Sequence, residues 1–583
     1  MESDQKGNVV FWNNKYINVL GCMLALLFCV MATHPFVSMG SIDDWSYIWS
    51  ARVLANTGQL TYNGWGAMPL GWLAYLGALF VKLFGFSFTT VRWSSMAVSL
   101  LCAALIHRVF VRSGASEGTA SVATLTLVLS PLFLPSEWMF SSDVPGLFVL
   151  VLCIYCCIRA FQSVSDNAAL GWLAIAALSN LVGGTVRQVA WLGVLLIVPS
   201  AAWFMRCRRH MLPVAAVLWS TGALGAALFL HWFNAQPYVV VDQILYRYHL
   251  NSAFNAANAT LLPWTCLLPV MSAFLVRSPA GKRFARDIAA VTGAIIGALL
   301  FWWAMKSPHD YFRIAPFGVD GSNVSIKGMG LGEILGTPAN GIPVFVQFLL
   351  VVAIFAASSS FLVCLIGSCS TLLAADSRSR SKHPLYPYVS NAYLMTLLAP
   401  FVIVFTCLIL TRSQVWDRYF LPLQFVFTLG LIRVYRQTIS EKLPWLCFAI
   451  GLLFTVYGMA AMHDFFSFQR ARVEATNNIS ATGIPRTAID GGHEYDGWTQ
   501  LELTGYVNEP RILVPSGAYQ EWIPPNQPFS CIGWFRRLTP SVHPQFYLSH
   551  NPDNCYAPSR FAPVIYQTWL PPRQRKLYIL DGH

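Results

Sequence analysis

Residues 16–47 read YINVLGCMLALLFCVMATHPFVSMGSIDDWSY and join a long apolar run to two adjacent carboxylates, Asp43 and Asp44. The run from 16 to 37 is long enough to cross a bilayer as a helix. The two acids follow closely, so we expect them at a membrane–water boundary. A carboxylate at the edge of hydrocarbon is costly and tends to persist where it has a partner or a function. For the pair alone, a solvated acidic loop is the simpler interpretation.

Apolar runs of this kind recur along the 583 residues, of which 55% are hydrophobic and 11% charged. An ordinary soluble domain carries roughly 25% charged residues. The pattern predicts an α-helical polytopic membrane protein with about 13 transmembrane helices. The expected spans are 16–37, 90–110, 119–135, 144–161, 167–183, 188–205, 211–233, 260–276, 288–305, 342–366, 389–410, 419–438 and 443–463.

The formal net charge of +12 follows the topology of the chain and does not indicate a nucleic-acid partner. Basic clusters follow spans that run inward, as the positive-inside rule requires. We therefore expect a multi-pass protein of the plasma (inner) membrane, with a cytoplasmic N-terminus and an extracytoplasmic C-terminus. The clusters lie at 107–112, 206–209, 277–286, 378–382 and 433–442.

Segment 68–84 is apolar but short, and it carries Lys82. If this segment crossed the membrane, the basic cluster at 107–112 would lie outside and the charge pattern would fail. We therefore expect a helix in the outer interface, anchored by Trp65 and Trp72. Residues 38–89 then form one outer loop, with a further interfacial helix near 45–56.

The composition changes after His463, and no spanning run follows. This predicts two domains, a transmembrane domain at 1–463 and a small extracytoplasmic α/β domain at 464–583. Alternating apolar residues predict strands at 511–514 and 576–580. Cys531 and Cys555 are the only cysteines of the second domain. In an oxidising compartment they are candidates for a disulfide, with a pair of buried free thiols as the alternative.

Charged and aromatic side chains gather on the expected outer face. Each alone is explained by an interfacial anchor or a salt bridge, but together they suit a lipid-linked phosphate, which arginine holds bidentately. A nearby carboxylate supplies a base for proton abstraction. The set comprises Asp43, Asp44, Glu137, Asp143, Arg187, Arg247, His249, Arg412, Asp417, Arg418 and Tyr419.

Three short elements carry a resemblance to a known family. They are Asp43-Asp44-Trp45-Ser46-Tyr47, Ser142-Asp143-Val144-Pro145 and Asp417-Arg418-Tyr419-Phe420-Leu421-Pro422. In this order they resemble the two acidic elements and the late Arg-Tyr-x-x-Pro run of the type C glycosyltransferases. That superfamily includes protein O-mannosyltransferases and lipid A aminoarabinose transferases. The second acid of the first element is Asp, where many members have Glu.

The resemblance implies a glycosyltransferase that moves a hexosyl or pentosyl group from a polyprenyl-phosphate donor, with inversion. The acceptor would be a hydroxyl of a glycan, lipid or protein at the outer face, in glycosylation of the cell envelope. The ligands of a metal site found in some members are not identified, so a divalent metal ion stays open.

The resemblance also implies roles for individual residues. Asp43 is the expected base, and Asp44 and Asp143 would orient the acceptor or the base. The donor phosphate would lie near Arg187, Arg247, Arg418 and Tyr419. Substrate contacts are expected from Trp45, Tyr47, Glu137 and His249.

Two other functions remain open at this point. A lipid-linked glycan polymerase or ligase also uses outer-face arginines, but it has no specific need for acids after the first span. A polytopic transporter or flippase would show broken helices or charges buried at mid-membrane, of which the sequence has few.

Overall fold

The computed structural model describes residues 14–240, 266–277, 293, 334–336, 389–410, 416–528, 531–552, 555–571 and 573–582. The expected spans 288–305 and 342–366 lie outside these residues, apart from position 293. The candidate residues Arg247, His249 and Arg412 also lie outside them.

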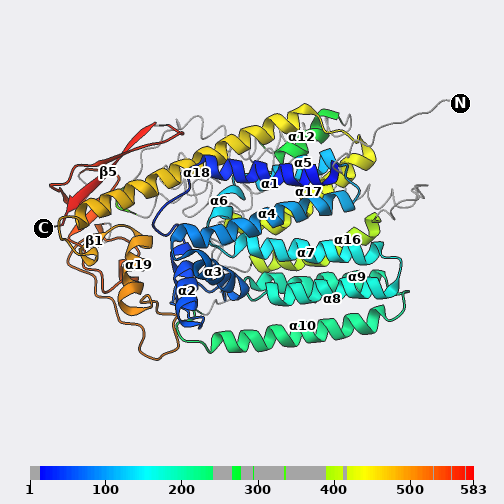
Figure 1. The fold of residues 1–583 in the computed structure, drawn as a ribbon, viewed down its shortest axis with the longest axis horizontal. Coiled ribbons are helices and arrows are strands. Elements are labelled where there is room, and N and C mark those ends of the chain that lie inside the picture. The colour runs from blue at the N-terminus through cyan, green and yellow to red at the C-terminus, as the bar shows by residue number, and fades with distance from the viewer. Residues whose placement is uncertain are drawn as a thin grey trace.

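Most described helices run side by side in a bundle (Figure 1). Five of them, α4, α7, α10, α16 and α18, are long and apolar enough to cross a membrane. Helix α7 is central, with 72% of its apolar window buried, whereas α10 is peripheral, with 17% buried. The long helices are α1 (Asn14–Ala32), α4 (Phe88–Arg112), α7 (Asp143–Gln162), α8 (Asp166–Gly183), α10 (Met211–Asn234), α16 (Asn391–Leu410), α17 (Leu421–Thr438) and α18 (Trp445–Ser480).

Two expected spans are not single α-helices. The span at 119–135 divides into α5 (Glu117–Val128) and α6 (Leu134–Trp138), because Pro131 has no backbone N–H to continue α5. The span at 188–205 divides into η1 (Gln188–Ala190), the π-helical turn η2 (Gly193–Ile197) and α9 (Val198–Phe204). Pro199 opens α9, where its missing N–H is tolerated. Of the span at 260–276, the structure describes α12 (Leu268–Arg277).

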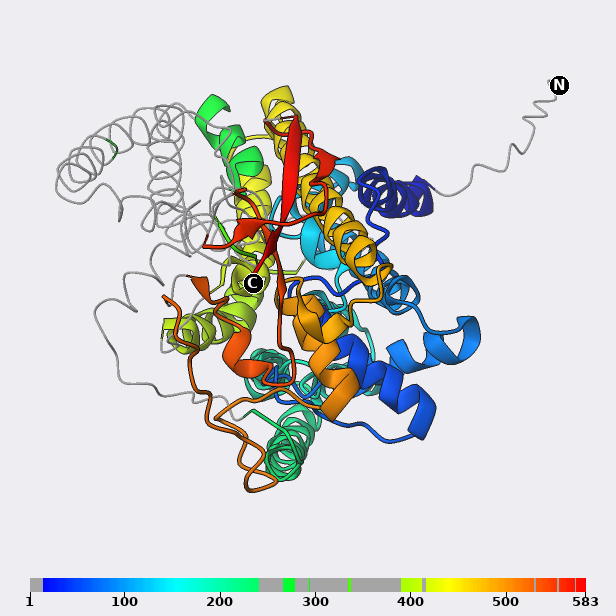
Figure 2. The same cartoon turned by 90° about the vertical axis from the view of Figure 1, so that its left-hand side faces the viewer.

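Helices α2 (Asp44–Thr57) and α3 (Gly71–Phe84) form within the expected outer loop. Figure 2 looks along the bundle and shows both helices lying across it, at the end that carries the C-terminal region. This arrangement fits the expected interfacial helices. Helix α2 ends at Gly58, whose φ of 76° gives the left-handed turn that glycine adopts readily.

The C-terminal region combines helix α19 (His493–Thr504) with a five-stranded sheet, which confirms the expected α/β composition. The sheet has the order β1-β2-β5-β3, with β4 also paired to β5. Among the strands that the structure describes, β1 and β2 pair in parallel, and the other three pairings are antiparallel. The strands are β1 (Ile489–Asp490), β2 (Phe546–Ser549), β3 (Ala557–Pro558), β4 (Val564–Gln567) and β5 (Gln574–Asp581).

Strand β5 confirms the strand expected at 576–580, whereas the strand expected at 511–514 is wrong. That segment contributes a single bridge between Ile512 and Val240, and Leu513 is exposed. The composition change at His463 also marks no break in the chain. Helix α18 continues through it to Ser480, because the residues beyond 463 pack against β4 and β5.

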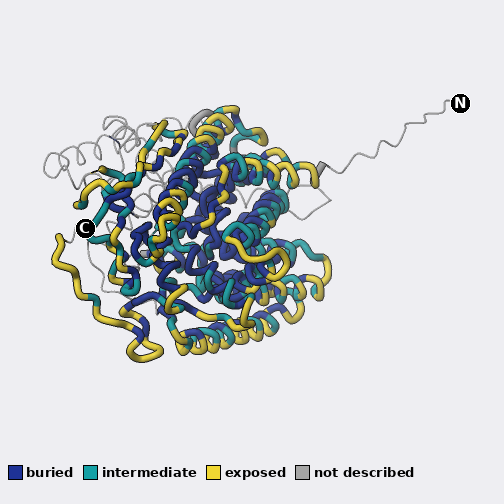
Figure 3. The backbone as a smooth tube through the Cα atoms, turned by 60° about the vertical axis from the view of Figure 1, so that its left-hand side comes forward, coloured by how far each residue is buried: buried dark blue, intermediate teal, exposed yellow. Residues whose placement is uncertain are grey.

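Buried positions concentrate inside the bundle (Figure 3). A second apolar cluster joins α2 and α3 to the C-terminal region through Trp498, Leu501 and Phe535. The outer helices and the C-terminal region therefore share one core, which fixes the loop before α2 relative to α19.

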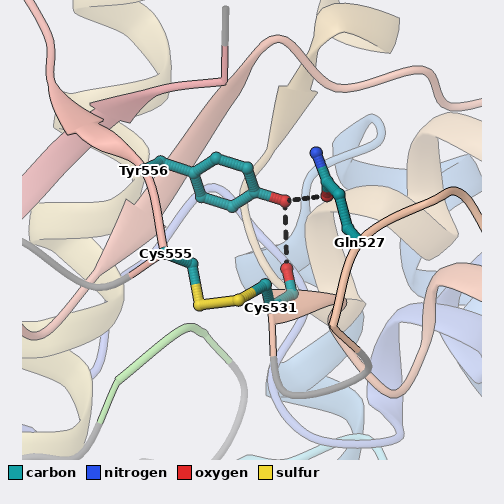
Figure 4. Close-up of a disulfide and its surroundings, with 4 residues drawn as sticks. All are labelled: Gln527, Cys531, Cys555 and Tyr556. Carbon is teal, nitrogen blue, oxygen red and sulfur yellow. Dashed lines mark hydrogen bonds between the residues drawn. A yellow bond between two sulfur atoms is a disulfide. The ribbon is translucent and has the colours of Figure 1, made fainter.

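Cys531 and Cys555 form the disulfide that the sequence offered as one of two interpretations (Figure 4). The Tyr556 hydroxyl lies beside it, 3.0 Å from the Cys531 carbonyl oxygen and 2.7 Å from Gln527 Oε1. The bridge ties the loop that carries Trp534 to the segment before β3.

Candidate active site

Arg418 lies between two of the predicted acids. Its Nη2 donates to Asp43 Oδ2 at 2.8 Å, and its Nε lies 3.4 Å from Asp143 Oδ2. Burial lowers the pKa of Arg418, but the charges of Asp143 and Asp43 raise it by more, so the pKa is raised overall. Arg418 is therefore a permanent cation, and it binds a carboxylate that lies 375 positions earlier in the chain.

Arg187 extends this chain of charges. Its Nη1 lies 2.5 Å from Asp143 Oδ1 and donates to Ser142 Oγ at 3.2 Å. Its guanidinium carbon lies 4.9 Å from the centre of the Tyr419 ring, a cation–π distance. Gly146 permits this approach, because a Cβ there would lie 2.8 Å from Arg187 Cδ. The order is Asp43, Arg418, Asp143, Arg187, with alternating charge.

Neither contact of Asp143 is a well-formed hydrogen bond. Asp143 Oδ1 and Arg418 Nε are both buried, and each has only its ion-pair contact among the described residues. A buried donor or acceptor left in this state is costly. Such a network gains from a ligand that brings oxygen atoms to the arginines.

Three of these side chains lie at or next to the N-terminal ends of helices. Asp43 precedes α2, Asp143 is the first residue of α7, and Arg418 lies in η4 (Asp417–Phe420), which leads into α17. Helix N-termini present free N–H groups and partial positive charge, both of which favour anions. Arg187 precedes η1 and completes the set.

Asp44 has a different environment from Asp43. Its carboxylate accepts from Arg92 Nε at 2.7 Å and from the Ser41 N–H at 2.6 Å, and both charged side chains are fully buried. Arg92 also donates to the carbonyl oxygens of Val37 and Met39. The pair clamps the loop that precedes α2.

Three predicted substrate-contact residues are buried. Tyr47 lies close enough to Asp43, Arg418 and Asp143 for their charges to act on its phenol. Burial is the main cause that raises the pKa of Tyr47 far above 10, so its phenol stays neutral. Trp45 is fully buried against Trp65 and Phe535.

Glu137 is also fully buried, and no described residue hydrogen-bonds its carboxylate. It is close enough to Cys29 and Cys102, on α1 and α4, to interact with them electrostatically. The structure does not bring Trp45 or Glu137 to the cavity beside Asp43.

The C-terminal region holds the residue before Asp43. Ile42 has a φ of 54°, a left-handed conformation that strains a β-branched residue. Its N–H donates to Glu494 Oε1 at 3.1 Å, and its carbonyl oxygen lies 3.0 Å from His493 Nε2. Arg472 Nη2 in turn donates to Glu494 Oε2 at 2.8 Å, with both side chains fully buried. These contacts fix the backbone that aims Asp43.

A small cavity opens beside the ion pairs. It is lined by Asp43, Asp44, Asp143 and Arg418 together with Ser41, Ile42, Ser136, Met139 and Ser141.

The residues of this site do not form a metal centre. Among the described residues, no three His, Cys, Asp or Glu side chains gather in a way that could hold a metal ion. Asp43 and Asp143 are each paired with arginine, which competes with a cation for the same oxygens.

Sequence reasoning missed several residues of the site. The sequence does point to Arg92, because a lone arginine near the start of an expected apolar span usually has a partner or a function. Trp65 was expected as a membrane anchor, but its Nε1 donates to Asp43 Oδ1 at 3.1 Å. His493 and Glu494 lie about 450 positions from Ile42, and no local pattern reveals the contact.

Residues 69–233 match the family model described as dolichyl-phosphate-mannose-protein mannosyltransferase. This match confirms the resemblance to the type C glycosyltransferases. It includes α7 and therefore Asp143, and it also includes Arg187. The acids at 43 and 44 and the Arg-Tyr run at 418 and 419 lie outside it.

Three solved structures are similar at low identity. ArnT from Cupriavidus metallidurans in the apo state is 14% identical over 80% of each chain, with a TM-score of 0.38. The oligosaccharyltransferase from Archaeoglobus fulgidus in the apo form is 13% identical, covering 92% of this chain and 64% of that chain, with a TM-score of 0.44. The donor-bound protein O-mannosyltransferase complex from S. cerevisiae is 13% identical, covering 42% and 37%, with a TM-score of 0.32. No curated protein matches the sequence.

Proposed function

We propose that this protein transfers a sugar from a polyprenyl phosphate to an acceptor hydroxyl at the outer face of the membrane, with inversion. The observation that carries the proposal is the alternating chain Asp43–Arg418–Asp143–Arg187 beside a small cavity. It combines a carboxylate base with two cations suited to a phosphate.

The reaction follows from these contacts. The acceptor oxygen attacks the anomeric carbon of the donor, and its proton passes to Asp43. The bond between that carbon and the phosphate oxygen breaks, and polyprenyl phosphate leaves with the electron pair. Arg418 and Arg187 stabilise the charge that grows on the phosphate, which is the usual use of preorganised cations.

We assign different roles to the three acids because their surroundings differ. Asp43 is partly exposed, with 26% of its side chain accessible, so an acceptor hydroxyl reaches it. Asp143 holds both arginines in place. Asp44 is assigned to positioning rather than to chemistry, because its carboxylate is buried against Arg92.

The test uses purified full-length protein reconstituted into sealed liposomes, with a panel of polyprenyl phosphates carrying radiolabelled mannose, glucose, arabinose or aminoarabinose. We expect one donor to lose its label from the lipid in the wild type. Arg418→Lys should slow this loss about 10- to 100-fold, the size of a lost charge-assisted hydrogen bond. Arg108→Lys is the control, because Arg108 lies near the C-terminal end of α4, away from the site, and it should not change the rate at which the donor loses its label.

Two results would contradict the proposal. One is a wild-type protein that consumes no donor of the panel. The other is label that crosses the membrane while still attached to lipid, as a flippase would produce. Growth of a lipid-linked glycan from the released sugar would instead indicate a polymerase or ligase.

A further inference from the structure

A group of aromatic rings lies beside the proposed base and is not used by the chemistry described above. Trp65 belongs to the loop between α2 and α3, and His493, Trp534 and Phe535 belong to the C-terminal region. The Trp65 ring centre lies 6.3 Å from Trp534, 6.1 Å from His493 and 5.2 Å from Phe535. Trp534 lies 5.6 Å from His493 and 5.3 Å from Phe535. We call these four residues the aromatic cluster.

The aromatic cluster begins at Asp43 and ends at the surface. Trp65 Nε1 donates to Asp43 Oδ1 at 3.1 Å, so its indole touches the proposed base. His493 and Phe535 are buried, whereas Trp534 is 49% exposed. The rings therefore form a continuous aromatic path from solvent to the carboxylate.

The polar atoms of the aromatic cluster are largely occupied within the protein. Trp65 Nε1 is bound to Asp43, and His493 Nε2 is bound to the Ile42 carbonyl oxygen. What the cluster offers to an incoming molecule is chiefly ring surface. A peptide is usually gripped through its backbone at a strand edge or in a groove, and the cluster includes no strand.

A sugar ring matches this surface. One face of a pyranose or furanose carries C–H groups and its rim carries hydroxyls, and the negative face of an indole attracts the C–H face. A ring packed on Trp534 and Trp65 would keep its hydroxyls free, with one directed toward Asp43. Ligand sites combine apolar and aromatic walls with few polar groups in the same way.

Two features hold Trp534 in place. The Cys531–Cys555 disulfide cross-links the chain three residues before Trp534. Phe535 packs edge-on against the buried ring of Trp45, at 5.9 Å and 88°. The exposed indole is therefore preorganised, which lowers the entropy cost of binding.

We propose that the aromatic cluster is the acceptor subsite and that the acceptor is a glycan, whose terminal sugar stacks on Trp534 and Trp65. This inference rests on the proposed function, because it supplies the hydroxyl that Asp43 deprotonates. It goes further by selecting carbohydrate from the three acceptor classes that the sequence left open.

The test measures binding without turnover. Full-length protein in nanodiscs is mixed with linear hexasaccharides of mannose, glucose, galactose or arabinose, or with a Ser/Thr-rich decapeptide. Saturation-transfer NMR then reports which ligand protons touch the protein. We expect transfer to the ring C–H protons of at least one hexasaccharide.

The variants locate the binding. Trp534→Ala should weaken it about tenfold, the equivalent of about 1.4 kcal/mol. Trp534→Phe keeps a ring and should weaken it less, which separates stacking from misfolding. Trp569→Ala is the matched control, because Trp569 is another exposed tryptophan of the C-terminal region, at 48%, and it stacks on His463 instead. It should leave binding unchanged.

Three results would overturn the inference: no hexasaccharide binds, Trp534→Ala binds as well as the wild type, or only the decapeptide binds. These outcomes are distinct from failure of the proposed function. A protein that consumes the lipid donor but binds no hexasaccharide refutes the glycan subsite alone. A protein that binds a hexasaccharide at Trp534 but consumes no donor refutes the transferase proposal alone.

Discussion

Asp43 and Asp44 are neighbours in the chain, but their side chains have different surroundings. Asp43 accepts from Arg418 and Trp65 and is partly open to the cavity, whereas Asp44 is sealed against Arg92. A helix start explains the difference, because successive side chains at the first turn point in directions about 100° apart. The Asp43 carboxylate is therefore accessible from the cavity, whereas the Asp44 carboxylate binds Arg92 on α4.

This difference predicts that two conservative variants change the stability of the protein by different amounts. Asp44→Asn leaves Arg92 buried without its counter-charge, and breaking a buried pair costs about 3–5 kcal/mol. Asp43→Asn affects a partly exposed side chain and should change stability by less than about 1 kcal/mol. Thermal unfolding of both variants in the same detergent measures this. An Asp44→Asn protein as stable as Asp43→Asn would refute the clamp.

At the scale of elements, α19 controls the loop before α2. The start of α19 binds both backbone polar groups of Ile42 through His493 and Glu494. Glu494→Gln keeps an oxygen for the Ile42 N–H but loses the charge opposite Arg472. We expect kcat to fall about 10- to 100-fold with little change in the donor KM, because a small misplacement of a catalytic group has effects of this size.

A control variant lies on the same helix. Glu502→Gln removes a partly exposed ion pair with Arg486, and such pairs contribute little. Its kcat should stay close to that of the wild type. Steady-state kinetics of both variants decide the point, and an unaffected kcat in folded Glu494→Gln would show that α19 does not position the base.

Two buried acids, Asp490 at the end of β1 and Asp496 in the first turn of α19, lie on either side of the turn between these elements. Asp490 and Asp496 accept from the N–H groups of Gly492 and Gly491, respectively, each at 3.1 Å. Burial first, and then the charge of Asp490, raise the pKa of Asp496 well above its usual value of 3.8. The folded state therefore keeps a proton that the unfolded chain releases.

Stability should fall as the pH rises above about 4 toward the folded pKa of Asp496, because the folded state then binds more protons than the unfolded state. Asp496→Asn keeps an acceptor for the Gly491 N–H and cannot ionise. The stability of this variant should therefore fall less than that of the wild type as the pH rises. Unfolding temperatures of both proteins between pH 4 and pH 8 test the prediction. Parallel curves for the two proteins would contradict it.

At the scale of the whole molecule, the sequence predicts the helical bundle well because apolar length and composition are local properties. The spans at 90–110, 144–161 and 211–233 coincide with α4, α7 and α10 to within two residues. The expected span at 119–135 overlooked the break at Pro131, although proline interrupts a helix for local reasons.

Long-range contacts account for what the sequence did not reveal. The continuation of α18 beyond His463 depends on packing against β4 and β5, which lie about 100 residues later. Arg418 was a candidate on its own, but its place between Asp43 and Asp143 needs three helix starts to converge. The support of Ile42 by α19 likewise follows only from the folded chain.

The same arrangement predicts an orientation across the membrane. Helices α2 and α3 lie at the end of the bundle that carries the C-terminal region, and the C-terminal end of α4, with Arg108 and Arg112, lies at the other (Figure 1). We predict that the first end is extracytoplasmic, because the basic clusters belong inside.

Two exposed positions test this orientation. In intact cells, a membrane-impermeant maleimide should label Gln59→Cys, in the loop after α2, and should not label the native Cys207. Cys207 should react only after the membrane is broken, and Cys207→Ser supplies the background. Labelling of Cys207 in intact cells would place the basic cluster at 206–209 outside and reverse the topology.

The most direct test of the central claim is the turnover of Asp43→Asn compared with its binding of the lipid donor. The substitution keeps the shape of the side chain and one acceptor oxygen for Trp65 or Arg418, but it removes the negative charge and the proton acceptor. We expect the transfer rate to fall about 10²- to 10⁴-fold, the usual contribution of a general base. The donor Kd should change less than about tenfold, because the arginines hold the phosphate. A folded Asp43→Asn protein that transfers sugar at the wild-type rate would show that Asp43 is not the base.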